Sequence, residues 1–119
     1  MDKSIVVIDD EQGVLDVLCD LFAMEGLPVL CFDRPEQAEA MDAGTDPCLF
    51  LIDIMLPGTS GIELAQHLRD QRFRDTPMIA MSASDFMVRT AEDTGLFQEA
   101  IRKPFDVDTV LDTVERYLS

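Results

Sequence analysis

The sequence of 119 residues has no tryptophan, one tyrosine, one histidine, and only nine lysines and arginines against 24 acidic residues. Its formal net charge is −15 at pH 7. Proteins that bind nucleic acids use basic side chains to replace counterions along the phosphate backbone, so this shortage argues against direct nucleic-acid binding. The single histidine, His67, cannot build a zinc site by itself. We expect it to lie on the surface of a helix and not to transfer phosphoryl groups.

Long apolar runs are also absent. No apolar stretch of the sequence reaches the roughly 18 residues that a membrane span needs. The first residues, MDKSIVVIDDEQ, contain one short apolar run that meets acidic residues at once, so they lack the apolar centre of a signal peptide. We therefore expect no membrane partner and a cytoplasmic location.

Cysteine is scarce and odd in number. Cys19, Cys31 and Cys48 all lie in apolar surroundings. Cysteines in such surroundings are typical of small buried hydrophobic side chains in a reducing compartment, and we expect this arrangement here instead of a disulfide framework. An odd count leaves at least one thiol unpaired in any case.

The length and the 47% hydrophobic content fit one compact domain over residues 1–119, with no room for a separate output domain. The same sequence suits either a complete single-domain protein or one domain of a longer chain.

Short continuous apolar runs predict strands that are buried on both faces, because a half-exposed strand would alternate apolar and polar residues. These runs are Ile5–Ile8, Pro28–Phe32, Cys48–Ile52, Met78–Met81 and Ala100–Ile101.

Segments of helical length lie between and after these runs, and each carries a start or stop signal. The expected signals are Gly26 closing the first helix, Asp33 with Glu36 opening the second and Gly44 closing it, Ser60 with Glu63 opening the third, Asp85 and Gly95 bounding the fourth, and Asp106 capping the fifth. Strands that alternate with helices predict a doubly wound α/β fold, in which a parallel sheet carries helices on both faces.

Polar residues follow four of the apolar runs, at the edge where a doubly wound sheet places its binding crevice. They are Asp9 with Asp10, Asp53, Ser82 and Lys103. Each residue alone would be typical of a cap or a turn, but the ordered set at successive strand ends predicts a site.

Three neighbouring carboxylates repel one another and need a cation, and oxygen ligands of this kind suit Mg²⁺. A carboxylate beside a metal ion and a lysine can attack a phosphoryl group, so the site supports formation and loss of an aspartyl phosphate.

The whole sequence resembles the receiver domains of bacterial two-component response regulators. The resemblance rests on VVIDDE at 6–11, LIDIMLPGTSG at 51–61, MSAS at 81–84 and KPF at 103–105. It implies a flavodoxin-like sheet of five parallel strands in the order 2-1-3-4-5 with five helices. It also implies a phosphorelay role, in which a sensor histidine kinase or a histidine phosphotransfer protein is the donor and a downstream protein is the target. A homodimer that depends on phosphorylation is a further implied partner.

The resemblance also assigns roles to individual positions. Asp53 would accept the phosphoryl group, and Lys103 and Ser82 would contact it. Mg²⁺ would be held by Asp10, by Asp53, by the backbone carbonyl of Met55, and by Asp9 through water. The bond between Lys103 and Pro104 would be cis.

One position departs from the family pattern. Receiver domains commonly have an aromatic residue three positions before the lysine, and this sequence has Ala100 there. Phe97 and Phe86 are the nearby aromatic residues, and the spacing leaves open which of them would take over its switching role.

Two other functions stay open from the sequence. A phosphatase of the haloacid-dehalogenase type would use the same aspartate, but such proteins usually carry a second acid where Met55 stands. A receiver-like adaptor would bind partners without phosphorylation, which would explain Ala100. We interpret the basic cluster of Arg69, Arg72 and Arg74 as a solvated helix end and not as a docking patch.

Overall fold

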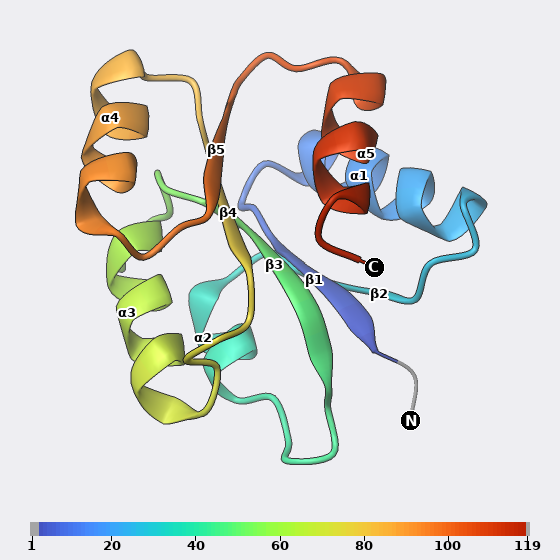
Figure 1. The fold of residues 1–119 in the computed structure, drawn as a ribbon, viewed down its shortest axis with the longest axis horizontal. Helices are drawn as coiled ribbons and strands as arrows, with labels where there is room; N and C mark the ends of the chain where they lie inside the picture. Colours follow the sequence, from blue (N-terminus) through green and yellow to red (C-terminus); the bar gives the residue numbers. More distant parts are fainter. Residues whose placement is uncertain (1–2, 119) are drawn as a thin grey trace.

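The computed structural model describes residues 3–118. Its centre is one parallel sheet with the strand order β2-β1-β3-β4-β5 (Figure 1). The strands are β1 (Ser4–Ile8), β2 (Val29–Phe32), β3 (Pro47–Asp53), β4 (Met78–Ser82) and β5 (Glu99–Arg102). The helices are α1 (Gln12–Met24), α2 (Pro35–Glu39), α3 (Gly61–Gln71), α4 (Asp85–Thr94) and α5 (Val107–Glu115). The predicted doubly wound fold and strand order are therefore confirmed.

Two helical layers enclose the sheet, with α1 and α5 on one face and α2, α3 and α4 on the other (Figure 1). Strand β1 shows why its apolar run is continuous. Ile5 and Val7 pack into the core formed with α1 and α5, whereas Val6 and Ile8 pack into the core formed with α2 and α3. Both faces of the strand are buried, so every position must be apolar until the run ends at Asp9.

Most of the predicted helix boundaries are confirmed. The Ser60 hydroxyl accepts a hydrogen bond from the Glu63 N–H at 3.1 Å and opens α3. The Asp106 carboxylate accepts one from the Thr109 N–H at 2.8 Å and opens α5. Helix α4 ends at Gly95, whose φ of 74° is a left-handed conformation that glycine adopts without strain.

The second helix is shorter than predicted and is capped differently. The side-chain carbonyl of Gln37 accepts hydrogen bonds from the N–H groups of Asp33 at 3.1 Å and Arg34 at 3.2 Å. Asp33 is therefore not the capping acceptor. The helix ends at Glu39 and not near Gly44, because the Asp42 carboxylate accepts from the Gly44 N–H at 2.9 Å and folds that segment into a turn.

The interpretation of the basic cluster as a solvated helix end is wrong for Arg69. Its half-buried guanidinium donates to the carbonyls of Phe73 at 2.9 Å, Thr76 at 2.7 Å and Leu96 at 2.6 Å. Arg72 likewise donates to the carbonyl of Asp42 at 2.6 Å. These arginines join loops that lie far apart in the sequence, so their role is structural.

The expectation of reduced cysteines is also wrong for one pair. Cys19 of α1 and Cys31 of β2 form a disulfide, with Cα atoms 6.5 Å apart. Cys48 is the free thiol that the odd count requires. His67 lies on the surface as expected, where its Nδ1 is 2.7 Å from the Glu39 carboxylate. Within residues 3–118, no helix is long and apolar enough to cross a membrane.

Candidate functional site

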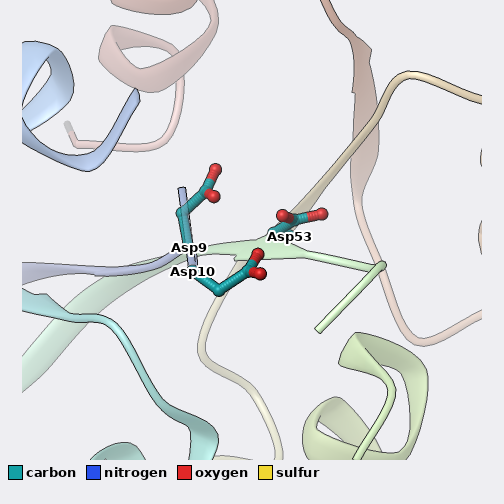
Figure 2. A group of neighbouring side chains, drawn as sticks. All are labelled: Asp9, Asp10 and Asp53. Carbon is teal, nitrogen blue, oxygen red and sulfur yellow. The ribbon is translucent and has the colours of Figure 1, made fainter. Parts of the chain in front are cut away.

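The carboxyl ends of β1 and β3 bring three aspartates together (Figure 2). Asp9 and Asp10 follow β1, and Asp53 is the last residue of β3. One carboxylate oxygen from each of the three lies within 4.8 Å of the other two. Asp9 is 0% exposed and Asp53 is 3% exposed, whereas Asp10 is exposed. The site is therefore a recess with two buried carboxylates and one at its mouth.

The backbone holds Asp53 at two points, one on its carboxylate and one on its own main chain. The Met55 N–H donates to Asp53 Oδ1 at 3.0 Å. The first residue of α3 is Gly61, and a Cβ atom built there would lie 2.3 Å from the Asp53 carbonyl oxygen. Only glycine allows α3 to pack this closely, so the start of α3 supports the strand end that carries Asp53.

Lys103 places its ammonium among the acids from the end of β5. Its Nζ lies 2.7 Å from Asp9 Oδ2, 3.3 Å from Asp53 Oδ2 and 3.4 Å from Glu11 Oε1. The lysine side chain is only 9% exposed. The peptide bond from Lys103 to Pro104 is cis, as expected. Sequence reasoning missed Glu11, although its place directly after the two aspartates is a signal that could have found it.

Burial and charge shift the protonation equilibria of this group. Burial raises the pKa of Asp53, the negative charge of Asp9 raises it further, and the Met55 N–H and Lys103 oppose this shift. Burial alone would lower the pKa of Lys103, but its hydrogen bond to Asp9 and the charge of Asp53 outweigh that effect and raise it. A protonated lysine therefore holds together two carboxylates that burial would otherwise destabilise.

Ser82 is the last residue of β4 and is 0% exposed. The strand partner of Asp53 is Met81, so Ser82 lies one residue beyond Asp53 along the neighbouring strand. Its backbone carbonyl accepts from the Lys103 N–H at 2.8 Å, and its hydroxyl accepts from the Ser84 N–H at 3.1 Å. Since the hydroxyl is the acceptor in that bond, it keeps its own proton for donation.

The aspartate group fits a small hard cation. Mg²⁺ binds oxygen at about 2.0–2.1 Å, so opposite ligands of one ion lie roughly 4.2 Å apart. One oxygen from each of the three carboxylates lies within 4.8 Å of the other two, so the three are close enough together to face one ion. Met55 lies two residues after Asp53 and is 59% exposed. Its carbonyl as a metal ligand stays a prediction.

The two aromatic residues near Ala100 differ in their surroundings. Ala100 is half-buried and packs beside the cluster formed by Ile54, Ala80 and Ala91. Phe97 packs partly buried against the same cluster, whereas Phe86 is 74% exposed on α4. Phe86 therefore lies outside the core, and an aromatic contribution from this region rests on Phe97.

Comparison with known proteins agrees with this geometry. A family model described as the response regulator receiver domain matches residues 5–115. Sporulation initiation phosphotransferase F of Bacillus subtilis is 31% identical over 99% of this chain and 95% of its own length. The phosphate regulon transcriptional regulatory protein PhoB of Pseudomonas aeruginosa is 40% identical over 68% of this chain, which corresponds to 36% of its own length.

Solved structures share the fold over nearly the whole chain. The response regulator TrrA of Thermotoga maritima, solved in complex with Mg²⁺ and beryllofluoride, has a TM-score of 0.85 and 27% identity, covering 98% of this chain and 99% of its own. The chemotaxis protein CheY4 of Vibrio cholerae has a TM-score of 0.89 and 19% identity, covering 99% and 100%. With the family model over residues 5–115 and the sheet order 2-1-3-4-5, the chain belongs to the response regulator receiver domain family of two-component systems.

Proposed function

We propose that the chain accepts a phosphoryl group on Asp53 from a phosphohistidine and transmits this state by changing a binding surface. The observation that carries the proposal is the buried Asp53 carboxylate beside the Lys103 ammonium, 3.3 Å away, and beside two further carboxylates. A carboxylate oxygen of Asp53 forms the new P–O bond as the P–N bond to the donor imidazole breaks. The electron pair of that bond leaves with the imidazole nitrogen, which the solvent protonates.

Each surrounding residue has a task in this transfer. Lys103 neutralises charge on the phosphoryl oxygens from the Asp9 side of the recess, and the Ser82 hydroxyl donates its free proton to one of them. Asp10, Asp53 and the Met55 carbonyl would hold Mg²⁺ directly, and Asp9 would hold it through water. When bound, Mg²⁺ would supply the second positive charge that a dissociative phosphoryl transition state needs.

Two relatives support this chemistry by analogy. TrrA, which was solved with Mg²⁺ and beryllofluoride, is 27% identical to this chain. The phosphotransferase relative of Bacillus subtilis is matched over 95% of its length. We accordingly propose a sensor histidine kinase or a histidine phosphotransfer protein as the donor.

A protein donor needs a surface beside the recess that holds Asp53. A hollow of about 350 Å³ lies next to Lys103, between α1 and the loop that follows β5. Its apolar lining includes Val14, Val17, Pro104 and Phe105. Because the hollow shares Lys103 with the site, a donor helix seated there would bring its phosphohistidine to the mouth of the recess. We assign this hollow to the donor protein.

The output of the domain follows from the added charge. A phosphoryl group brings about −1.5 to −2 charges to Asp53 and would draw Ser82 and Lys103 toward it. The loops after β4 and β5 would move with these residues. The surface that they form is then presented to a downstream protein or to a second copy of the chain. We propose a cytoplasmic signalling domain over residues 1–119 that turns over no substrate other than its own phosphoryl group.

One observation favours a second candidate. Ala100 lacks the aromatic ring that would couple Ser82 to the surface, which suits a receiver-like adaptor that binds partners without phosphorylation. The two candidates differ in their dependence on Asp53. An adaptor keeps its partner binding when Asp53 is replaced by Asn, and a phosphorylated switch loses its response.

The test of the proposed function is incorporation of a phosphoryl group from acetyl phosphate with Mg²⁺. Wild-type protein should gain one phosphoryl group by intact mass, and Asp53→Asn should gain none. Asp46→Asn is the matched control, since Asp46 precedes the opposite end of the same strand. Equal incorporation in wild type and Asp53→Asn, or none in wild type, would overturn the assignment.

A further inference from the structure

Arg102 joins the end of β5 to the loop that leads into α4. Its Nε donates to the Ala83 carbonyl at 3.1 Å, and its Nη1 forms an ion pair with Asp85 Oδ1. Arg102 is also the strand partner of Ser82 and the residue directly before Lys103. One side chain thus connects the loop after Ser82 with the strand that delivers Lys103.

The Ser82 hydroxyl continues this connection into α4. It accepts from the Ser84 N–H at 3.1 Å, and the Ser84 hydroxyl in turn accepts from the Met87 N–H at 3.2 Å, which caps the helix. A movement of the Ser82 hydroxyl toward Asp53 would strain its bond to Ser84, the N-cap residue of α4. Arg102 would oppose this movement, because its side chain binds both Ala83 and Asp85 of the same loop.

Position 100, where the family commonly has an aromatic ring, is occupied by the half-buried Ala100. A hollow of about 440 Å³ lies along β5 and α5, and its lining includes Ala100, Arg102 and Phe105. A methyl group cannot couple the β4–α4 loop to β5 as a ring at this position would. The contacts of Arg102 with Ala83 and Asp85 do connect this loop to β5.

We propose that Arg102 is a positioning residue that latches the β4–α4 loop in its unphosphorylated arrangement, so that phosphorylation of Asp53 must break the latch to move α4. The proposal rests on the proposed function of Asp53. It identifies a route from Ser82 to the surface that does not use the aromatic position.

The latch predicts an effect of unusual sign. Arg102→Ala should weaken the unliganded fold slightly and strengthen binding of a phosphoryl mimic, because the latch no longer opposes the bound arrangement. The Arg102 side chain is 54% exposed and that of Asp85 is 69% exposed, so this is a surface ion pair. Surface ion pairs stabilise a conformation only slightly, and we therefore expect the affinity for the phosphoryl mimic to rise by about two- to fivefold.

The experiment measures binding of beryllofluoride with Mg²⁺ by calorimetry, a method that needs no tryptophan signal. Arg102→Ala should bind more tightly than wild type. Arg102→Lys, which keeps the charge but loses the planar fork, should fall between them. Arg116→Ala is the matched control, because Arg116 is an exposed arginine paired with Glu99 at 2.9 Å outside the β4–α4 loop. It should bind as wild type does.

Amide NMR spectra of the unliganded proteins give a second readout. In Arg102→Ala the signals of Ser84 and Met87 should shift part of the way toward their positions in beryllofluoride-bound wild type. Unchanged or weaker binding by Arg102→Ala, with wild type still binding, would overturn the latch and leave the role of Asp53 intact. Failure of wild type to bind at all would overturn both.

Discussion

The ammonium of Lys103 lies closer to Asp9 than to Asp53, at 2.7 Å against 3.3 Å. Asp9 is fully buried, and its other oxygen accepts from the Glu11 N–H at 2.9 Å. Asp9 therefore anchors the lysine, and the longer contact to Asp53 is the one that an incoming phosphoryl group can replace. The same arrangement makes the fold depend on the lysine.

Lys103→Met should destabilise the protein strongly. The substitution leaves two buried carboxylates without their cation, and removing one partner of a buried pair costs about 3–5 kcal/mol. Saturating Mg²⁺ should restore part of this loss, since the metal supplies positive charge to the same carboxylates. Urea unfolding with Mg²⁺ and with a chelator measures both effects. Lys3→Met is the control, because Lys3 is the other lysine of the chain and is exposed. Equal stability of the two variants would contradict the anchoring role.

Asp53→Asn should stabilise the metal-free protein. The folded pKa of Asp53 lies above its ordinary value of 3.8, so the folded state binds more protons than the unfolded state between these two values. Stability contributed by this group is therefore lost as pH rises through the folded pKa. The amide has no such cost, so we expect Asp53→Asn to be more stable than wild type at neutral pH.

Thermal melts over a pH series in chelator measure this gain. Wild type should lose stability as pH rises from 3.8 through the folded pKa of Asp53, and the variant should lack this loss. Added Mg²⁺ should raise the melting temperature of wild type and have a much smaller effect on the variant, because ligand that binds only the folded state stabilises it. A variant that melts below wild type in chelator would refute this account.

Gly61→Ala should impair the site although Gly61 touches no phosphoryl group. The new Cβ would lie 2.3 Å from the Asp53 carbonyl, so the end of β3 or the start of α3 must shift. We expect a loss of about 1–3 kcal/mol and a slower labelling of Asp53. Gly13→Ala in α1 meets no atom within 4 Å and should be neutral or stabilising by about 0.5–1 kcal/mol. Chemical unfolding and acetyl phosphate labelling of both variants decide the matter.

The sheet and the polar residues at its edge could be predicted from the sequence, because a parallel strand that is buried on both faces is a continuous apolar run. The site residues follow the ends of these runs, and the parallel sheet places those ends at one edge. They are Asp9, Asp53, Ser82 and Lys103. Contacts set by side-chain direction across long separations had no such signal. Arg69 reaches the Leu96 carbonyl 27 residues away, and nothing in the local composition marks that contact.

Two other features of the structure differ from the prediction. Asp33 followed by Glu36 is a capping pattern, yet Gln37 provides the acceptor for both N–H groups at this helix start. The pairing of Cys19 with Cys31 depends on α1 packing against β2. Apolar surroundings are common to reduced and to disulfide-bonded cysteines, so they do not distinguish the two states. Patterns in the sequence identify candidates, and packing selects among them.

The disulfide gives a prediction of its own. Protein purified without reductant should carry one alkylated cysteine, Cys48, and reduced protein should carry three. Because the bridge closes a sequence separation of 12 residues, Cys31→Ser should cost about 3 kcal/mol under oxidising conditions. It should cost much less with reductant present, where wild type also lacks the bridge. Alkylation at all three positions without reductant would show that the pair stays reduced.

The apolar hollow beside Lys103 predicts a separation between protein and small-molecule donors. Val17 is 50% exposed on α1 and lines the hollow. Val17→Glu would place a charge in the hollow where we propose that the donor protein binds. Transfer from a phosphorylated histidine phosphotransfer protein should slow by tenfold or more, which corresponds to a loss of about 1.4 kcal/mol or more in binding free energy. Labelling by acetyl phosphate should stay unchanged, because that donor needs only the recess.

Met24→Glu is the control on the same helix, since Met24 is 84% exposed and does not line the hollow. If Val17→Glu and Met24→Glu accept from the protein donor at the same rate, the donor docks elsewhere.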